Sequence, residues 1–151
     1  MSDRTMVILL VEDQPTDVLL VKRAFSRVNP GATLHSVADG DAAVAYLSGD
    51  GDFGDRKRHP LPDLLLLDLK LPRRSGLEVL AWLRAQVGLH RLPAIMLTSS
   101  GEQRDINQAY DLRVNSFLSK PTAFEDLHAM VQAIDDYCGR WNAKPVLEGA
   151  E

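Results

Sequence analysis

The sequence lacks several features that would assign it to a specialised class. Its single cysteine, Cys138, excludes a disulfide within the chain and fits a reducing compartment. It has no run of about 18 apolar residues and no signal-peptide core after Met1, so we expect neither a membrane span nor secretion. The net charge is only -4 at pH 7, which favours neither nucleic acid nor an anionic membrane as a partner. We therefore expect a cytoplasmic globular protein.

What the sequence does contain is typical of one ordinary domain. Its 151 residues are 45% hydrophobic and 25% charged, which matches an average soluble protein. This length is enough to bury one core. We expect a single domain over residues 1–151, with a core from about 6 to 138. The last helix is expected to stop at Gly139, leaving a tail over 139–151.

Short apolar runs indicate the strands. Continuous apolar runs of this length are typical of strands buried on both faces of a parallel sheet. The three strongest runs and two weaker ones lie at 6–11, 64–67, 94–97, 33–37 and 116–118.

Helical patterns fill the intervals between these runs. Pro15 suits the first position of one helix, and Asp39 suits the cap of a short helix ending near Ser48. Three segments have the spacing of a capping box, beginning at Ser75, Ser100 and Thr122.

The alternation of strand and helix predicts an α/β fold. Five repeats indicate a doubly wound five-stranded parallel sheet with five helices on its two faces, of the flavodoxin-like type with strand order 2-1-3-4-5. Residues 49–62 interrupt the pattern and are rich in glycine, aspartate and basic residues. We expect a long surface loop there.

The predicted strands end in residues of complementary chemistry. Glu12 and Asp13 follow the first strand, Asp68 the third and Lys120 the fifth, while Thr98 ends the fourth. In this strand order they converge on the rim where ligands bind in open parallel sheets. Clustered carboxylates repel one another unless a cation lies among them, and Mg²⁺ suits carboxylates, water and phosphate oxygens. Because a carboxylate can become an aspartyl phosphate, we predict Mg²⁺-assisted phosphoryl transfer to Asp68.

In this order and spacing the motifs resemble those of response-regulator receiver domains of two-component signalling, over about residues 6–138. The motifs are the acidic pair Glu12-Asp13, the D-x-x-x-P segment from Asp68 to Pro72, Gly76, Thr98, and the pair Lys120-Pro121.

The resemblance implies roles for the acidic residues and their neighbours. Asp68 would accept the phosphoryl group. Asp13, Asp68 and the backbone carbonyl of Lys70 would ligate Mg²⁺, with Glu12 holding a ligand water. The Lys70 side chain and Ser100 would flank the path of the water that hydrolyses the acyl phosphate, and so tune dephosphorylation.

The resemblance also implies a switch. Thr98 and Lys120 would contact the phosphoryl group, and Phe117 would be the aromatic residue that turns inward behind Thr98. The bond from Lys120 to Pro121 would be a cis peptide.

A finer resemblance is to the single-domain response regulators paired with bacterial phytochromes. It rests on the loop 49–62, the segment 93–100 and the short tail. It implies a stand-alone regulator that a sensor histidine kinase phosphorylates and that signals by protein contact. We expect a homodimer through the fourth helix, fifth strand, fifth helix and C-terminal tail. The candidate contacts, which broaden the apolar face of the last helix, are Met130, Tyr137 and Trp141.

Other functions were weighed against this one. A phosphatase with an aspartyl-phosphate intermediate resembles D-x-D, whereas Lys70 stands two residues after Asp68. We therefore expect catalysis only of the protein's own phosphorylation and dephosphorylation. A nucleotide-binding domain would need a glycine-rich turn after the first strand, which is missing. A receiver that never takes phosphate would have lost Asp68, Thr98 or Lys120. A relay intermediate passing the group to a histidine phosphotransfer protein stays open.

Overall fold

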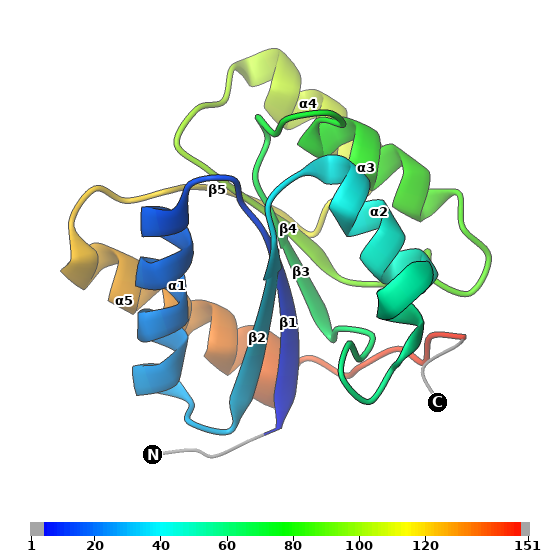
Figure 1. Cartoon of the computed structure of the whole chain (residues 1–151). Coiled ribbons are helices and arrows are strands. Elements are labelled where there is room, and N and C mark those ends of the chain that lie inside the picture. Colours follow the sequence, from blue (N-terminus) through cyan, green and yellow to red (C-terminus); the bar gives the residue numbers. More distant parts are fainter. Residues whose placement is uncertain (1–4, 149–151) are drawn as a thin grey trace.

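A computed structural model describes residues 5–148 and places five parallel strands in one sheet. The strand order is β2-β1-β3-β4-β5, so β1 lies between β2 and β3 and the predicted topology is confirmed (Figure 1). The strands are β1 (Met6–Val11), β2 (Ala32–Val37), β3 (Leu64–Leu67), β4 (Ala94–Thr98) and β5 (Ser116–Ser119).

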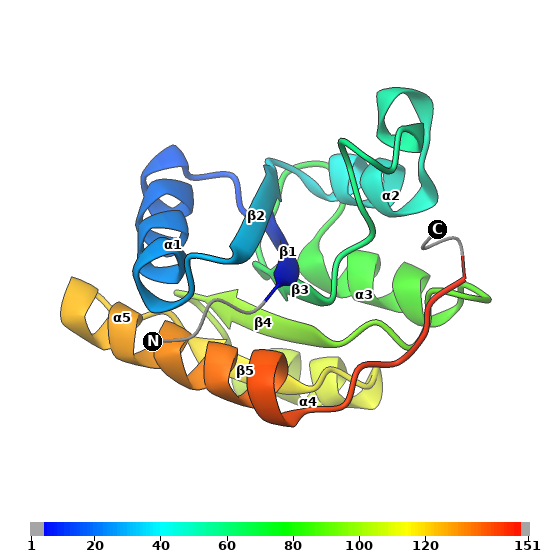
Figure 2. The same cartoon turned by 90° about the horizontal axis from the view of Figure 1, so that it is seen from below.

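Helices cover both faces of this sheet. The helix α1 packs against α5 on one face, and α2, α3 and α4 follow one another on the other (Figure 2). The α-helices are α1 (Pro15–Val28), α2 (Gly40–Ser48), α3 (Gly76–Arg84), α4 (Gln103–Asp111) and α5 (Phe124–Ile134). A short 3-10 helix, η1 (Gly51–Gly54), follows α2, and a π-helical segment, η2 (Asp135–Trp141), continues α5.

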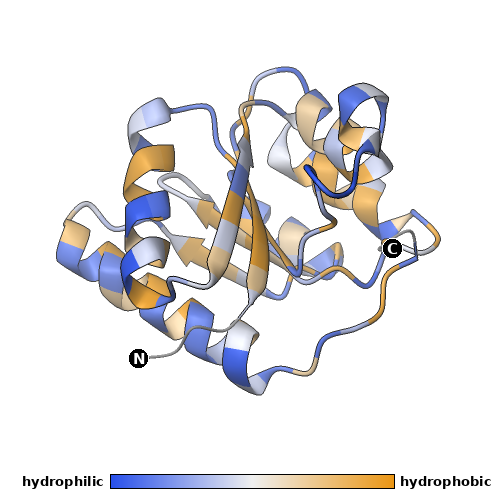
Figure 3. Cartoon of the chain, turned by 60° about the horizontal axis from the view of Figure 1, so that its bottom comes forward, coloured by the Kyte–Doolittle hydropathy of each residue, from blue (hydrophilic) through white to orange (hydrophobic). Residues whose placement is uncertain are grey.

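The strands supply a core on each side of the sheet. Successive strand residues point to opposite faces, so Leu65 and Leu67 pack under α2, α3 and α4 while Leu64 and Leu66 pack under α1 and α5. All four are buried, which explains why β3 is a continuous leucine run. In Figure 3 the hydrophobic colour concentrates in the central strands and the helix sides that face them.

Three of the predicted helix starts are confirmed. Pro15 stands at the first position of α1. The Asp39 side chain accepts a hydrogen bond from the Ala42 amide at the start of α2. Ser75 and Glu78 form the reciprocal bonds of a capping box at α3.

The other two predicted starts are wrong. The helix α4 begins two residues later than predicted, after Glu102, whose amide donates to the Asp105 carboxylate. The Ser100 amide donates to the Thr98 hydroxyl, so this residue belongs to the strand end and not to a helix cap. The helix α5 begins after Ala123, which has no side chain able to cap.

The end of the last helix also differs from the prediction. Helical backbone passes through Gly139 and ends at Trp141. Where α5 passes into η2, the buried Asp135 carboxylate accepts a hydrogen bond of 3.0 Å from the side-chain amide of Asn29 at the end of α1. This bond ties the two helices of one layer together.

Residues 49–62 are more ordered than the sequence pattern suggested. The Arg56 guanidinium donates to the carbonyls of Tyr46 and Leu47 at 2.8 and 2.9 Å, and so caps the C-terminal end of α2. The ring of Phe53 packs 5.1 Å from that of Tyr46. The segment is therefore a folded loop. Its arginine donates hydrogen bonds to two carbonyls in the last turn of α2, where no further helical turn supplies amide donors.

The C-terminal tail lies on its own domain. It runs along the amino ends of the strands toward the turn before β4 (Figure 2). Leu147 is only 8% exposed and joins the core under α2, α3 and α4. The Glu148 amide donates to the Gly88 carbonyl at 2.9 Å, and the Lys144 ammonium lies 3.5 Å from Asp63. Residues 142–148 therefore pack on their own domain, and the expected contact of this tail with a partner stays a prediction.

No helix in the described range 5–148 is both long enough and apolar enough to cross a membrane.

Candidate functional site

Backbone pairing fixes the acidic residues at the carboxyl rim of the sheet. The Glu12 amide donates to the Val37 carbonyl at 3.0 Å, and the Asp68 amide donates to the Val11 carbonyl at 3.1 Å. Both bonds extend the ladders of neighbouring strands by one residue. Ligand oxygens of Glu12, Asp13 and Asp68 consequently lie within 4.8 Å of one another. The predicted convergence of the three carboxylates on one rim is present in the fold.

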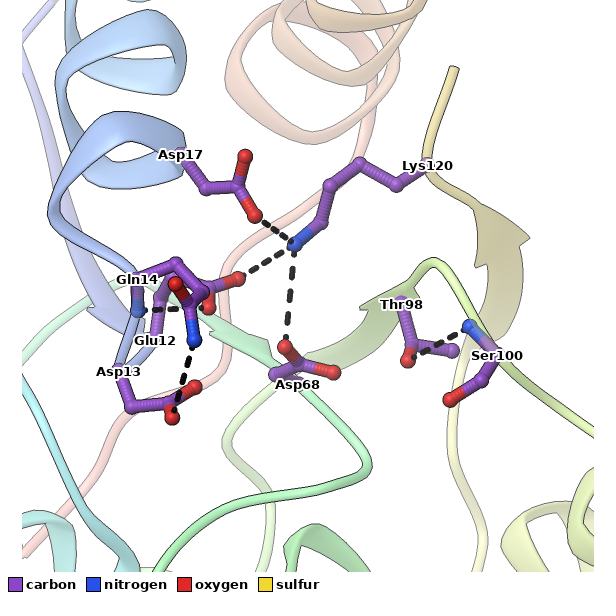
Figure 4. A network of polar contacts seen from close by, with 8 residues as sticks. All are labelled: Glu12, Asp13, Gln14, Asp17, Asp68, Thr98, Ser100 and Lys120. Carbon is purple, nitrogen blue, oxygen red and sulfur yellow. Dashed lines mark hydrogen bonds and ion pairs between the residues drawn. The ribbon is translucent and has the colours of Figure 1, made fainter. Parts of the chain in front are cut away.

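Lys120 brings the positive charge to this rim. Its amide donates to the Thr98 carbonyl at 2.8 Å, which fixes the backbone at the end of β5. Its ammonium nitrogen lies 2.5 Å from Glu12 Oε1, 3.0 Å from Asp17 Oδ2 and 3.7 Å from Asp68 Oδ2 (Figure 4). The side chain is only 9% exposed, so a solvent-shielded cation faces the acidic cluster.

Asp17 is a member of the site that the motifs did not reveal. It lies in the first turn of α1, and its carboxylate reaches Lys120. The available signal was its position: Pro15 starts the helix, so Asp17 lies in the turn that directly follows the acidic pair at the end of β1.

Burial and charge shape the protonation of this cluster. Burial raises the pKa of Glu12 to about 7, against the hydrogen bond from Lys120, which lowers it. Burial would lower the pKa of Lys120, but its hydrogen bonds to Glu12 and Asp17 raise it above the ordinary value. Lys120 is therefore an ammonium at neutral pH. A cation among the carboxylates would favour the ionised form of Glu12.

The donor set suits a hard divalent cation. Glu12, Asp13 and Asp68 offer carboxylate oxygens, which are the ligands that Mg²⁺ takes alongside water and phosphate. Glu12 is buried and receives the Gln14 amide on its second oxygen, while Asp13 lies nearer the surface. This rim can bring a metal and a phosphoryl group together.

The switch candidates lie beside the cluster. Thr98 is buried and stands across from Asp68, and its hydroxyl accepts the Ser100 amide at 3.3 Å (Figure 4). Phe117 is half-buried against the α2–α4 core. A Cβ on Gly101 would lie 2.9 Å from the Phe117 ring, so the glycine leaves space for this ring.

Lys70 and Ser100 line the same open hollow. It has a volume of about 490 Å³ and lies between the β3–α3 loop and the start of α4, where Ser75 and Arg104 also line it. The role of Lys70 and Ser100 in dephosphorylation stays a prediction.

Two close backbone contacts hold the β3–α3 loop that carries Lys70. A Cβ on Gly40 would lie 1.9 Å from the Arg74 carbonyl oxygen, and one on Gly76 would lie 2.1 Å from that of Asp68. The Gly40 amide also donates to the Pro72 carbonyl. Only glycine permits these approaches.

The expected cis peptide at Pro121 is wrong. No cis bond occurs between residues 5 and 148, so Lys120 reaches the rim through a trans peptide. The trans isomer is favoured intrinsically by about 0.5–1 kcal/mol at X–Pro bonds.

The three dimer candidates do not share one environment. Tyr137 and Trp141 are 66% and 72% exposed, whereas Met130 is half-buried and packs against the α1–α5 core. Met130 packs beside core residues of both α1 and α5, so Tyr137 and Trp141 are the exposed members of the set, and the role of all three in a dimer stays a prediction.

The fold and rim define a class, namely flavodoxin-like domains with an acidic cation site and a lysine at the carboxyl ends of the strands. Residues 8–132 match the family model of the response regulator receiver domain, and the chain belongs to this family.

Individual relatives agree with this assignment. The chain is 39% identical over 144 residues to the probable methanogenesis regulatory protein FilR2 of Methanothrix harundinacea, covering 95% of this chain and 90% of that protein. It is also 39% identical over 136 residues to response regulator Rcp1 of Synechocystis, covering 90% of each.

Solved structures show the same likeness. The phosphorylated cyanobacterial phytochrome response regulator RcpA superimposes with a TM-score of 0.87 at 33% identity, covering 93% of this chain and 99% of RcpA. The Mn²⁺-bound form of Rcp1 superimposes with a TM-score of 0.84 at 37% identity, covering 93% and 99%. A divalent metal is therefore known in a relative of the same fold.

Proposed function

We propose that this response regulator is switched by transfer of a phosphoryl group from a sensor histidine kinase to Asp68. One observation carries the proposal: Asp68, 8% exposed, belongs to the acidic cluster and lies 3.7 Å from the Lys120 ammonium. An Asp68 oxygen attacks phosphorus, a P–O bond forms, the P–N bond to the imidazole breaks, and the leaving nitrogen takes a proton from solvent.

Different residues around Asp68 would bind the metal and stabilise the transferring phosphoryl group. Asp13, Asp68 and the Lys70 carbonyl would hold Mg²⁺, with Glu12 binding through a ligand water. The metal, when bound, neutralises charge on the phosphoryl oxygens. Lys120 supplies a second, fixed positive charge.

The response to phosphorylation is proposed to run through Thr98. Its hydroxyl, which accepts a hydrogen bond from the Ser100 amide, moves to donate one to a phosphoryl oxygen, and Phe117 moves into the space this leaves. Lys70 and Ser100, which line the hollow beside the acceptor, set access for the hydrolytic water.

The acceptor is tested by mass spectrometry after incubation with acetyl phosphate and Mg²⁺. We expect one phosphoryl group on Asp68 in the wild type, and none on that peptide in Asp68→Asn or after chelation. Asp126→Asn, which alters an exposed acid in α5, should label like the wild type. Label on another residue, or labelling indifferent to chelator, contradicts the proposal.

The kinase is proposed to be a bacterial phytochrome. The support is the likeness to RcpA, described as a phytochrome response regulator, over nearly the whole of both chains. Purified phosphorylated phytochrome kinase should lose its label to this protein faster than an unrelated histidine kinase does. Equal rates from both kinases argue against this pairing.

A homodimer through α4, β5, α5 with its continuation η2, and the C-terminal tail is proposed as the output form, in the cytoplasm. Tyr137 and Trp141 carry the support, because two large aromatic side chains lie exposed near each other on η2. Light scattering should show a dimer that Tyr137→Glu weakens, with Val87→Glu, an exposed apolar position after α3, as the matched control. A monomer at micromolar concentration in both the free and fluoroberyllate-bound states contradicts it.

A further inference from the structure

We propose that Asp17 is a positioning residue that competes with the phosphoryl group for the ammonium of Lys120. The inference rests on the proposed function of Asp68 and goes beyond it, since Asp17 belongs to neither the acceptor nor the metal ligands. Its effect would be to set how strongly the resting protein resists phosphorylation.

The geometry separates Asp17 from the metal cluster. Its Oδ2 lies 3.0 Å from the Lys120 nitrogen, closer than Asp68 Oδ2 at 3.7 Å. The carboxylates that can share a cation are Glu12, Asp13 and Asp68, and Asp17 is outside that group. In Figure 4 Asp17 and Asp68 reach the nitrogen from different sides.

The competition follows from the position of the nitrogen and from charge. The two short contacts of the Lys120 ammonium go to Glu12 and Asp17, while Asp68 lies 3.7 Å away on another side. A phosphoryl group on Asp68 can receive the third N–H donor closely only if the nitrogen moves toward Asp68 and away from Asp17. A phosphoryl group on Asp68 adds negative charge on the side away from Asp17. Because Lys120 is only 9% exposed, water cannot easily replace either anion as its partner. Every gain in the Lys120–phosphoryl contact therefore weakens the contact with Asp17.

A purely structural role for Asp17 makes a different prediction. An acid in the first turn of a helix stabilises the helix through the macrodipole, and Asp17 occupies such a position in α1. Asp126 occupies the equivalent place in α5 but is exposed. If Asp17 only stabilised its helix, replacing either acid would lower stability and leave phosphoryl affinity alone.

The primary experiment measures fluoroberyllate binding at saturating Mg²⁺ by calorimetry, since fluoroberyllate with Asp68 mimics the acyl phosphate. Asp17→Asn keeps the shape and an acceptor oxygen but removes the charge. We expect it to bind roughly two- to fivefold more tightly, the range for losing one partner of a partly exposed ion pair. Asp17→Glu should return to wild-type affinity, and Asp126→Asn should equal the wild type. Weaker or unchanged binding by Asp17→Asn overturns the proposal.

A second experiment tests the pairing without any phosphoryl group. Melting temperatures of the metal-free wild type, Asp17→Asn, Lys120→Met and the double variant form a double-mutant cycle. We expect the two shifts to be non-additive, because each substitution removes the same contact; additive shifts overturn the pairing. If the wild type binds no fluoroberyllate while the cycle still shows coupling, the assignment of Asp68 fails and the ion pair stands.

Discussion

Leu147 is predicted to carry most of the free energy that docks the C-terminal tail. It is 8% exposed and lies in the same core cluster as Leu9 and Leu83, although it is near the end of the described chain. Fully burying a leucine side chain contributes about 1.5–3 kcal/mol, and Leu→Ala at a core position costs about 2–5 kcal/mol with the cavity included. A tail can detach instead of enclosing a cavity, so we expect Leu147→Ala to lower the free energy of unfolding by about 1.5–3 kcal/mol.

The neighbouring residues provide the controls. Val146 is 79% exposed, so Val146→Ala should leave stability within about 0.5 kcal/mol of the wild type. A chain ending at Ala143 loses the docking contacts altogether, and its stability sets the largest loss that Leu147→Ala can cause. Urea denaturation measures all three. Docking of the tail through Leu147 is refuted if Leu147→Ala and Val146→Ala have the same free energy of unfolding, or if Leu147→Ala lowers it more than the truncation does.

Three further predictions concern polar groups inside the fold. Arg56→Lys should lower the free energy of unfolding by about 1–2 kcal/mol, because an ammonium cannot span the two carbonyls at the end of α2; Lys57→Arg, at an exposed neighbour, should be neutral in the same urea titration. Asn29→Ala removes the 3.0 Å hydrogen bond to the buried Asp135, so we expect the free energy of unfolding to fall by about 2–3 kcal/mol and amide exchange in η2 to become faster. Unchanged exchange in η2 would show that this bond to the end of α1 does not hold η2 in place. Burial lowers the pKa of His35 below 6.5, so the unfolded chain binds the proton at a higher pH than the folded protein, and stability falls as the pH drops below that value. His35→Gln should reduce the dependence of melting temperature on pH between pH 7 and 5, and an equal dependence in both proteins would show that His35 is not the group responsible.

The rim of the site could be predicted from the sequence because topology alone places it. Glu12 and Asp68 directly follow apolar runs, Lys120 directly follows β5, and parallel strands bring such positions to one edge. No side-chain detail is needed for that step. The strand order then decides that Glu12 and Asp68 are neighbours across β1 and β3.

What the sequence could not supply depends on side-chain reach and on tertiary packing. Asp17 contacts a lysine 103 residues away, so its place in the first helical turn does not identify its partner. Arg56 looked like part of a solvated charged loop, and only the fold shows that it binds the carbonyls at the end of α2. Leu147 lies in a short proline-containing segment without helical or strand periodicity, so no sequence pattern indicates that it is buried.

The docked tail also bears on how the chain folds. Leu9 in β1 and Leu147 belong to one core cluster, so the packing around the first strand is not complete until almost the whole described chain is available. Contacts of such long sequence separation slow folding, because the loop between them must close before they contribute. The central strands and α1 to α3 can collapse earlier, which would leave the amino ends of β3 and β4 uncovered in an intermediate. We therefore expect the tail to dock last during refolding. Leu147→Ala should then increase the unfolding rate and leave the main refolding rate unchanged.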